Sequence, residues 1–336
     1  MIILILRHKH YISQIFLYIF PQKIIFLVVR MFDPTHFNPD GKSLVELAFL
    51  FENEVIAQQF AINADLLGDY TFCGEECEGV LVPHKDSSQE FGVRLQCNVC
   101  GRRRSMTYNS VFLRGKLEVR TVLLLIYCWA NKFSNGFTCQ QAHVTDKTVT
   151  NYFEAFRDAC TFWCENHMEK IGGPGKTVEV DESLFVKRKH NVGRITGNMD
   201  QLVFGGVCRE DKKRFLVHVP NRKSQTLIQE IEDHIDPNSR VYSDSFKSYN
   251  QLSALGWDHS TVNHSRNFVE PVTGVHTQTV ERMWRDAKDV KKRYNGIPRK
   301  EIDSHLHEYL WRTNNDVNGS NCFRKAIELI SFCNYY

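Results

Sequence analysis

The spacing of apolar residues changes near the middle of the chain, from the period of a helix to that of a strand. Before this point, residues 43–64 and 117–133 carry apolar side chains at helical intervals, which predicts one helix over each range. A turn at 135–136, a short helix over 138–143 and a longer helix capped by Thr145 are expected to follow. This order is typical of a helix-turn-helix, whose second helix enters the DNA major groove, although three-helix units without a nucleic-acid role share it.

In the second half, the apolar positions alternate with a period of two. A glycine-rich stretch at 172–175 separates the two patterns and is typical of a linker. Three successive strands, followed by helices and strands in alternation, predict an α/β layer with a mixed sheet. The expected strands are 176–186, 201–208, 214–219, 240–243 and 260–262, and the expected helices are 224–235, 246–255 and 277–294.

Four of the eleven cysteines form two closely spaced pairs. They are Cys73 with Cys77, and Cys97 with Cys100. Two tight turns that each aim two thiolates at one ion supply the four tetrahedral ligands of a structural Zn²⁺. Apolar residues between the pairs predict short strands, so we expect a zinc ribbon over 71–116; four unconnected buried thiols are the alternative. Thiolates kept for zinc also indicate a reducing, intracellular setting.

Residues 1–42 are expected to be an apolar leader outside the fold. Arg7 and Lys23 interrupt its apolar run and Pro21 breaks it. No uncharged run reaches the ~18 residues of a spanning helix, so no stable membrane association is expected. A signal peptide without a convincing cleavage site and an upstream extension before Met31 are the two explanations of this segment.

The net charge of +3 is an average over segments of opposite sign. Residues 101–120 hold six Lys/Arg and one acid, and residues 281–300 hold eight Lys/Arg and three acids, so each is +5 and the remainder is −7. Two basic stretches on an acidic background favour a polyanionic partner, with solvated helix faces as the alternative. A chain with 42% apolar and 24% charged residues is neither disordered nor collagen-like.

Three carboxylates lie where an α/β fold places functional groups. Asp181 is expected on the strand face opposite its neighbouring valines, near the strand end. Asp244 ends the fourth expected strand, and Glu281 begins the basic helix over 277–294. Taken singly, each acid is better explained as a solvated or capping residue, and for Asp244, which precedes an expected helix, capping is the main alternative.

Four separated motifs follow one another along the second half of the chain. They are IGGPGKTVEVDES from Ile171, YSDSF from Tyr242, HTQTVE from His276 and HEYLWR from His307. Together they resemble the transposases of the Merlin superfamily and their bacterial insertion-sequence relatives, over about residues 45–333. The resemblance implies an RNase H-like DDE recombinase.

The family triad falls on Asp181, Asp244 and Glu281, which the resemblance implies as catalytic residues and as ligands of two Mg²⁺ or Mn²⁺ ions. Some bacterial relatives carry Asn at the third position, where this chain has Glu281. Hard oxygen ligands suit these ions, whereas Zn²⁺ is expected at the thiolates. Two such ions ~3.5–4 Å apart can activate the attacking oxygen and stabilise the leaving oxygen of an in-line displacement.

Basic side chains in four places are expected to contact DNA: on the ribbon, at the start of the second helix of the helix-turn-helix, after the first strand and on the Glu281 helix. They are Arg102, Arg103, Arg104, Lys147, Lys187, Arg188, Lys189, Lys288 and Lys292. His276 is expected near the scissile phosphate, with capping or packing as the alternative.

We therefore expect a cut-and-paste DNA transposase that binds terminal inverted repeats and cleaves and transfers strands of double-stranded DNA. A catalytically inactive, zinc-dependent DNA-binding protein and a metal-dependent nuclease of the same fold are the alternatives. Family behaviour implies a homo-oligomer on DNA, in the nucleus of a eukaryote or the cytoplasm or nucleoid of a bacterium. The expected parts are a leader (1–42), a helical segment (43–70), a zinc ribbon (71–116), a helix-turn-helix region (117–170) and an RNase H-like catalytic domain (171–336).

Overall fold

The structure is a computed structural model, in which residues 39–336 form one compact unit. It describes residues 40–67, 72–74, 76–89, 91–108, 110–114, 117–185, 202–263, 269–271, 273–293, 297 and 299–333. None of the described helices combines the length and the apolar character that crossing a bilayer requires.

Two short helices, α2 (Leu44–Leu50) and α3 (Glu54–Asn63), replace the single helix expected over 43–64. Ser43 and Glu46 form a capping box at the start of α2. The side chain of Asn53 accepts a hydrogen bond from the N–H of Ile56 and so begins a second helix. The polar residues between the two helices therefore act as a helix start that the apolar spacing did not indicate.

A four-stranded antiparallel sheet follows, in the order β1-β2-β3-β4. Its strands are β1 (Phe72–Gly74), β2 (Cys77–Lys85), β3 (Val93–Cys97) and β4 (Arg103–Ser105). Leu81 lies directly opposite Cys97 in the pairing of β2 with β3, and Leu95 is buried beside them. The expected strands between the cysteine pairs are thus present, and they bring the two pairs to one end of a small core.

The next three helices match the expected order. They are α4 (Val119–Ala130), α5 (Asn135–Ala142) and α6 (Asp146–His167). The prediction of a turn at 135–136 is wrong, because the Ser134 side chain caps α5 and these two residues form its first turn. His143 ends α5 with a φ of 52°, and the Thr145 side chain caps α6 as predicted.

The second half of the chain forms a mixed sheet, as the sequence predicts, and its five strands lie in the order β7-β6-β5-β8-β9. Its strands are β5 (Thr177–Leu184), β6 (Leu202–Cys208), β7 (Arg214–Val219), β8 (Arg240–Asp244) and β9 (Asp258–Val262). Strands β5, β6 and β7 pair antiparallel, whereas β5, β8 and β9 pair parallel. The helices of this half are α7 (Ser224–His234), α8 (Gln278–Arg293), α9 (Ile302–Asn314) and α10 (Cys322–Cys333), of which α10 contacts α4 and α6.

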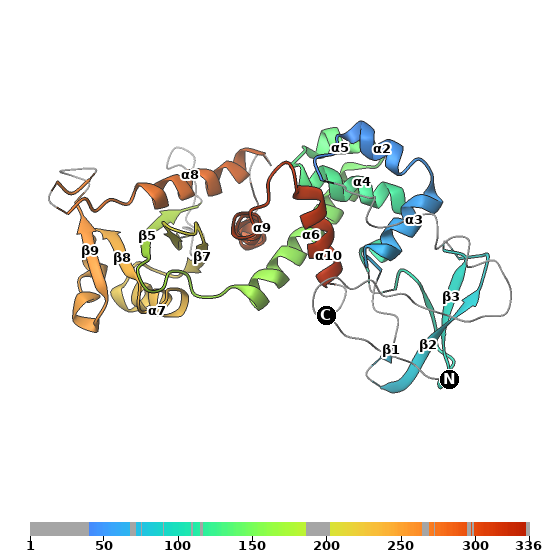
Figure 1. The fold of residues 1–336 in the computed structure, drawn as a ribbon, viewed down its shortest axis with the longest axis horizontal. Helices are drawn as coiled ribbons and strands as arrows, with labels where there is room; N and C mark the ends of the chain where they lie inside the picture. The colour runs from blue at the N-terminus through green and yellow to red at the C-terminus, as the bar shows by residue number, and fades with distance from the viewer. Residues whose placement is uncertain are drawn as a thin grey trace, which may run out of the picture. The chain divides into compact units, whose positions relative to one another are not determined.

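Helices cover both faces of this sheet, with α7 on one side and α8 on the other (Figure 1). On the α7 side, Val178 and Val180 of β5 pack with Leu227 of α7. On the α8 side, Val203 of β6 packs with Met283 of α8 and with residues of α9. Each fully buried apolar side chain of this kind contributes about 1.5–3 kcal/mol to folding.

Gly205 of β6 lets α8 lie close to the sheet. This residue is directly opposite Asp181 of β5, on the face that α8 covers. A Cβ atom at this position would lie 2.5 Å from a methyl carbon of Leu216 and 3.1 Å from the terminal methyl of Met283. The missing side chain therefore lets Met283 pack directly against the strand that lies beside Asp181.

The helix expected over 246–255 is not formed. Two short 3-10 turns, η4 (Lys247–Tyr249) and η5 (Ser253–Leu255), take its place. Serine side chains compete for backbone groups in this segment, since Ser248 Oγ donates to the carbonyl of Arg222 at 2.6 Å. This bond ties the segment after β8 to the loop before α7.

The glycine-rich stretch at 172–175, expected as a linker, is bound to the sheet region. Ile171 forms a parallel bridge with Ile235, and the Gly173 N–H donates to Ser239 Oγ at 2.8 Å. Gly172 has a φ of 95°, and a side chain there would collide with Ser239. This backbone conformation explains a glycine at the entry to β5.

Candidate active site

Asp181 and Asp244 lie at the carboxyl ends of two adjacent parallel strands. In the pairing of β5 with β8, Val178 is opposite Val241 and Glu179 is opposite Tyr242. The same register, continued by two residues, brings Asp181 beside Asp244, and both then face α8 because side chains alternate along a strand. The edge of the sheet thus presents two carboxylates side by side.

The pKa of Asp181 is raised, and its proximity to Asp244 is one of the lesser causes. Burial raises it from the usual 3.8 to about 7, and the negative charges of Glu182 and Asp244 add to the increase. Hydrogen bonds from the backbone of Glu182 and from the indole of Trp284 oppose it. A cation at this edge would relieve the same repulsion between carboxylates.

Helix α8 holds Asp181 from the side. The indole N–H of Trp284 donates a hydrogen bond of 3.1 Å to Asp181 Oδ2. One turn further along α8, the Lys288 ammonium donates to the hydroxyl of Ser183, which is the next residue after Asp181 on the same face of β5. Helix and strand therefore run along each other, joined by polar contacts as well as by the apolar core.

Glu281 lies in the first turn of α8, exposed to solvent. It precedes Trp284 by three residues, so both side chains lie along one side of the helix. In the described part of the chain, three or more metal-type ligands come within 4.8 Å of one another only at the cysteine cluster. Asp181 and Asp244 thus lie at one edge of the sheet and Glu281 lies on the adjoining helix. The three carboxylates do not converge on one point.

A fully buried carboxylate, Glu179, lies two residues before Asp181 on the same strand face. Its Oε2 accepts from the backbone N–H groups of Thr279 and Val280, at 2.8 and 3.0 Å. Its Oε1 accepts from Thr279 Oγ1 at 2.8 Å and from Arg209 Nε at 2.5 Å. Glu179 therefore contacts the start of α8, the helix that carries Glu281.

Arg222 connects the segments on the other side of the sheet. Its Nη2 donates to the buried Glu182 at 3.3 Å, and its guanidinium lies 4.5 Å from the ring centre of Phe246. The Phe246 N–H in turn donates to Asp244 Oδ1 at 3.0 Å. Asp244 thus accepts a hydrogen bond from a backbone N–H, as a capping residue would, although a turn follows it instead of the expected helix.

The four predicted thiol ligands form a cluster whose sulfur atoms all lie within 4.8 Å of one another. Cys73 and Cys100 have sulfur atoms 3.4 Å apart, and those of Cys77 and Cys97 are 3.7 Å apart. The backbone N–H of Cys100 is the main cause that lowers the pKa of Cys97 to about 6, whereas burial raises that of Cys73 to about 12. Four sulfur ligands at this spacing fit a tetrahedral Zn²⁺ site.

The predicted DNA-contacting residues lie in several places. Arg102 and Arg103 are exposed next to the cysteine cluster, and the Arg104 guanidinium lies 4.1 Å from the ring centre of Tyr108. Lys147 is exposed in the first turn of α6. Lys288 donates to Ser183, whereas Lys187, Arg188, Lys189 and the side chain of Lys292 lie outside what the structure describes.

His276 lies near Glu179, with its Nδ1 3.6 Å from Oε1. Its carbonyl accepts a 2.6 Å hydrogen bond from Arg209 Nη2. The contacts of His276 are therefore with the buried carboxylate at the start of α8. Proximity to a phosphate stays a prediction.

Sequence reasoning missed Glu179 and Arg209. One signal was present, since Glu179 is a charged residue between two valines of an expected strand. Such a residue needs a partner. Its partner could not be identified in advance, because Arg209 is thirty residues away along the chain.

Comparisons with known proteins bear on this chain. Residues 172–314 match the family model of the ISXO2-like transposase domain. A protein of Haemophilus influenzae named as an uncharacterized transposase-like protein is 36% identical over 103 residues, which are 31% of this chain and 82% of the relative.

Two solved structures show a more distant likeness. The catalytic core domain of the HTLV-2 integrase is 12% identical, with a TM-score of 0.27 over 43% of this chain and 87% of that chain. The Mos1 strand transfer complex is 10% identical, with a TM-score of 0.26 over 64% of this chain and 78% of that chain. Likeness at this level carries no information about function. The matched domain and the Haemophilus relative show that this chain belongs to the family of transposases with an ISXO2-like domain.

Proposed function

We propose that this chain is a DNA transposase that cleaves DNA at transposon ends and transfers the strands, with Asp181, Asp244 and Glu281 as its catalytic carboxylates. The observation that carries the proposal is the pair of aspartates at adjacent parallel strand ends, on the sheet face that α8 covers. In a chain of this family, that pair and an acid on the adjoining helix are the groups suited to polynucleotidyl transfer.

The donor set fits Mg²⁺ or Mn²⁺, because it consists of carboxylate oxygens. When bound, two such ions would activate the attacking oxygen and stabilise the leaving oxygen. Asp181, Asp244 and Glu281 would be the residues that hold them. Trp284 orients Asp181 through its N–H, and Lys288 adds a positive charge beside Ser183.

Recognition of the terminal inverted repeats is assigned to the first half of the chain. Arg102 and Arg103 lie exposed beside the cysteine cluster, which in this proposal holds a structural Zn²⁺. Lys147 lies at the exposed start of α6, the helix proposed to enter the major groove. The basic segment at 187–189 is proposed as a further phosphate contact. Paired transposon ends would then be held by a homo-oligomer, in the nucleus if the source is a eukaryote.

A plasmid assay tests the function as a whole. A donor plasmid carries a marker between the inverted repeats of the element, and a second plasmid is the target. Excision followed by insertion into the target supports the proposal. Cleavage without insertion would identify a nuclease, and binding without cleavage would identify a DNA-binding protein that has lost its chemistry.

A further inference from the structure

Glu179 is fully buried on β5, on the same face of the strand as Asp181. A carboxylate held entirely away from water is costly unless its charge is paired and its oxygens accept hydrogen bonds. The positions of its partners therefore indicate the role of Glu179. All of them lie on segments that surround the candidate active site.

The first set of partners is the N-terminus of α8. The N–H groups of Thr279 and Val280 have no carbonyl within the helix to bond to, because they belong to its first turn. Both donate to Glu179 Oε2, and the hydroxyl of Thr279 donates to Oε1. A negative charge at this end of a helix is also favoured by the helix dipole.

The second partner is Arg209, which follows β6. Its Nε donates to Glu179 Oε1, its Nη2 donates to the carbonyl of His276, and its guanidinium lies 4.7 Å from the ring centre of Tyr242. The backbone N–H of Arg209 donates to the carbonyl of Thr177 at 2.9 Å. One ion pair thus joins β5, β8 and the residues that lead into α8.

We propose that Glu179 is a positioning residue that fixes the start of α8, and with it Glu281, relative to Asp181. Glu281 follows Val280 directly, and its N–H donates to the carbonyl of Thr277 within the same turn. A shift of that turn would therefore move Glu281 away from the aspartates. The inference rests on the proposed function in so far as it gives Glu281 a catalytic role.

Glu179 is not itself a metal ligand in this arrangement. Each of its two oxygens already accepts two hydrogen bonds, which occupies the lone pairs of the carboxylate. Glu179 would therefore affect a reaction at Asp181 and Asp244 indirectly, through the position of α8. A purely structural role would lower stability alone, whereas a positioning role also changes how the site binds its ions.

The test compares Glu179→Ala and Glu179→Gln with Glu308→Gln in the full chain. Glu308 is a matched control because it is also buried and paired with an arginine, Arg312, but it lies on α9. Two quantities are measured: amide hydrogen exchange over 276–284, and the Mn²⁺ concentration for half-maximal cleavage of a duplex that carries a transposon end. If Glu179→Ala does not fold, the isosteric Glu179→Gln takes its place, since its amide oxygen can still accept one of the backbone N–H groups.

We expect faster exchange at Thr279 and Val280 in the Glu179 variants, and a half-activating Mn²⁺ concentration raised by ~10–100-fold, the usual effect of removing a group that supports a metal ligand. Glu308→Gln should change neither quantity. Unchanged Mn²⁺ dependence in a less stable Glu179 variant would overturn the positioning role. If the wild-type chain fails to cleave, the proposed function is wrong, and unchanged exchange over 276–284 would separately show that Glu179 does not anchor α8.

Discussion

The indole N–H of Trp284 lies 3.1 Å from Oδ2 of Asp181 and joins α8 to β5 at the candidate active site. The indole packs in the core beneath α8, with 5% of its surface exposed, while its single polar atom points to the carboxylate. Because the ring is held by packing, its N–H can fix one oxygen of Asp181 in a single orientation.

Replacing this donor should impair metal-dependent cleavage. Trp284→Phe keeps most of the apolar packing but leaves Asp181 Oδ2 without the indole N–H. We expect strand cleavage with Mn²⁺ to fall by ~10–100-fold, as is typical when a hydrogen-bonding partner of a metal ligand is lost. Trp257→Phe, which changes a partly buried tryptophan on the α7 side of the sheet, serves as the control. Equal cleavage rates for Trp284→Phe and the wild type would show that the hydrogen bond has no part in the reaction.

The raised pKa of Asp181 predicts a pH-dependent stability. Burial and two neighbouring carboxylates raise this pKa from 3.8 to about 7, so the folded chain keeps the proton in a pH range where the unfolded chain has released it. Stability therefore falls as the pH rises between about 4 and 7, by up to about 4 kcal/mol.

Asp181→Asn should remove this penalty, since an amide does not ionise. Without added Mg²⁺ or Mn²⁺, the variant should melt with the wild type at about pH 4 and at a higher temperature than the wild type at about pH 8. Thermal unfolding of both proteins across this range measures the difference. A constant difference in melting temperature at every pH would contradict the raised pKa.

The cysteine cluster predicts a link between metal content and folding. Cys97→Ser removes a proposed Zn²⁺ ligand, a thiol whose pKa is lowered to about 6, chiefly by the N–H of Cys100. We expect the variant to lose its zinc and to unfold the small sheet of β1 to β4, because metal binding and folding are coupled in such sites. Cys139→Ser, which lies on α5 outside the cluster, is the matched control. Full zinc content in Cys97→Ser, measured by atomic absorption, would exclude Cys97 as a ligand.

Two arginines should differ widely in their contribution to stability. Arg312 is buried on α9, where it pairs with Glu308 and donates to the carbonyls of Trp129 and Ala130 at the end of α4. Burial by itself raises the pKa of Glu308, but the charge and the hydrogen bond of Arg312, together with the charges of Arg157 and His305, lower it overall. Removing Arg312 leaves this carboxylate unpaired, so Arg312→Ala should cost about 3–5 kcal/mol in urea unfolding.

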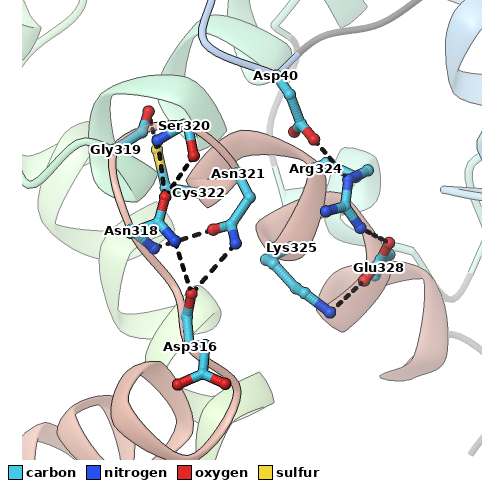
Figure 2. Close-up of polar contacts among 10 residues, drawn as sticks. All are labelled: Asp40, Asp316, Asn318, Gly319, Ser320, Asn321, Cys322, Arg324, Lys325 and Glu328. Carbon is cyan, nitrogen blue, oxygen red and sulfur yellow. Dashed lines mark hydrogen bonds and ion pairs between the residues drawn. The ribbon is translucent and has the colours of Figure 1, made fainter.

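Arg324 provides the comparison. It bonds Asp40 and Glu328, each at 2.7 Å, but at the surface (Figure 2). Water screens such pairs, so Arg324→Ala should cost only about 0–1 kcal/mol. Similar losses for the two variants would mean that α9 is not held to α4 through Arg312.

Much of the second half could be predicted because its strands are short, regular and separated by clear turn residues. The alternation around Val178 and Val180 predicted which face of β5 carries Asp181, and the end of the fourth expected strand predicted the place of Asp244. The spacing of the four cysteines likewise predicted that they come together.

The errors arose where polar side chains compete with the helix backbone. Asn53 begins a new helix inside an apolar pattern, and Ser248 bonds a neighbouring loop where a helix was expected. The Glu179 pairing with Arg209, and the approach of Trp284 to Asp181, depend on contacts between distant segments. Spacing along the chain holds no information about such contacts.

Asp181 and Asp244 are proposed to carry out metal-dependent strand cleavage. This role is tested most directly with Asp181→Asn and Asp244→Asn in a cleavage assay on transposon-end DNA with Mn²⁺, alongside a binding assay on the same DNA. The expected result is binding at the wild-type level with cleavage reduced by at least ~1,000-fold, about 4 kcal/mol in transition-state stabilisation. Cleavage at the wild-type rate by either variant would contradict the assignment of the carboxylates.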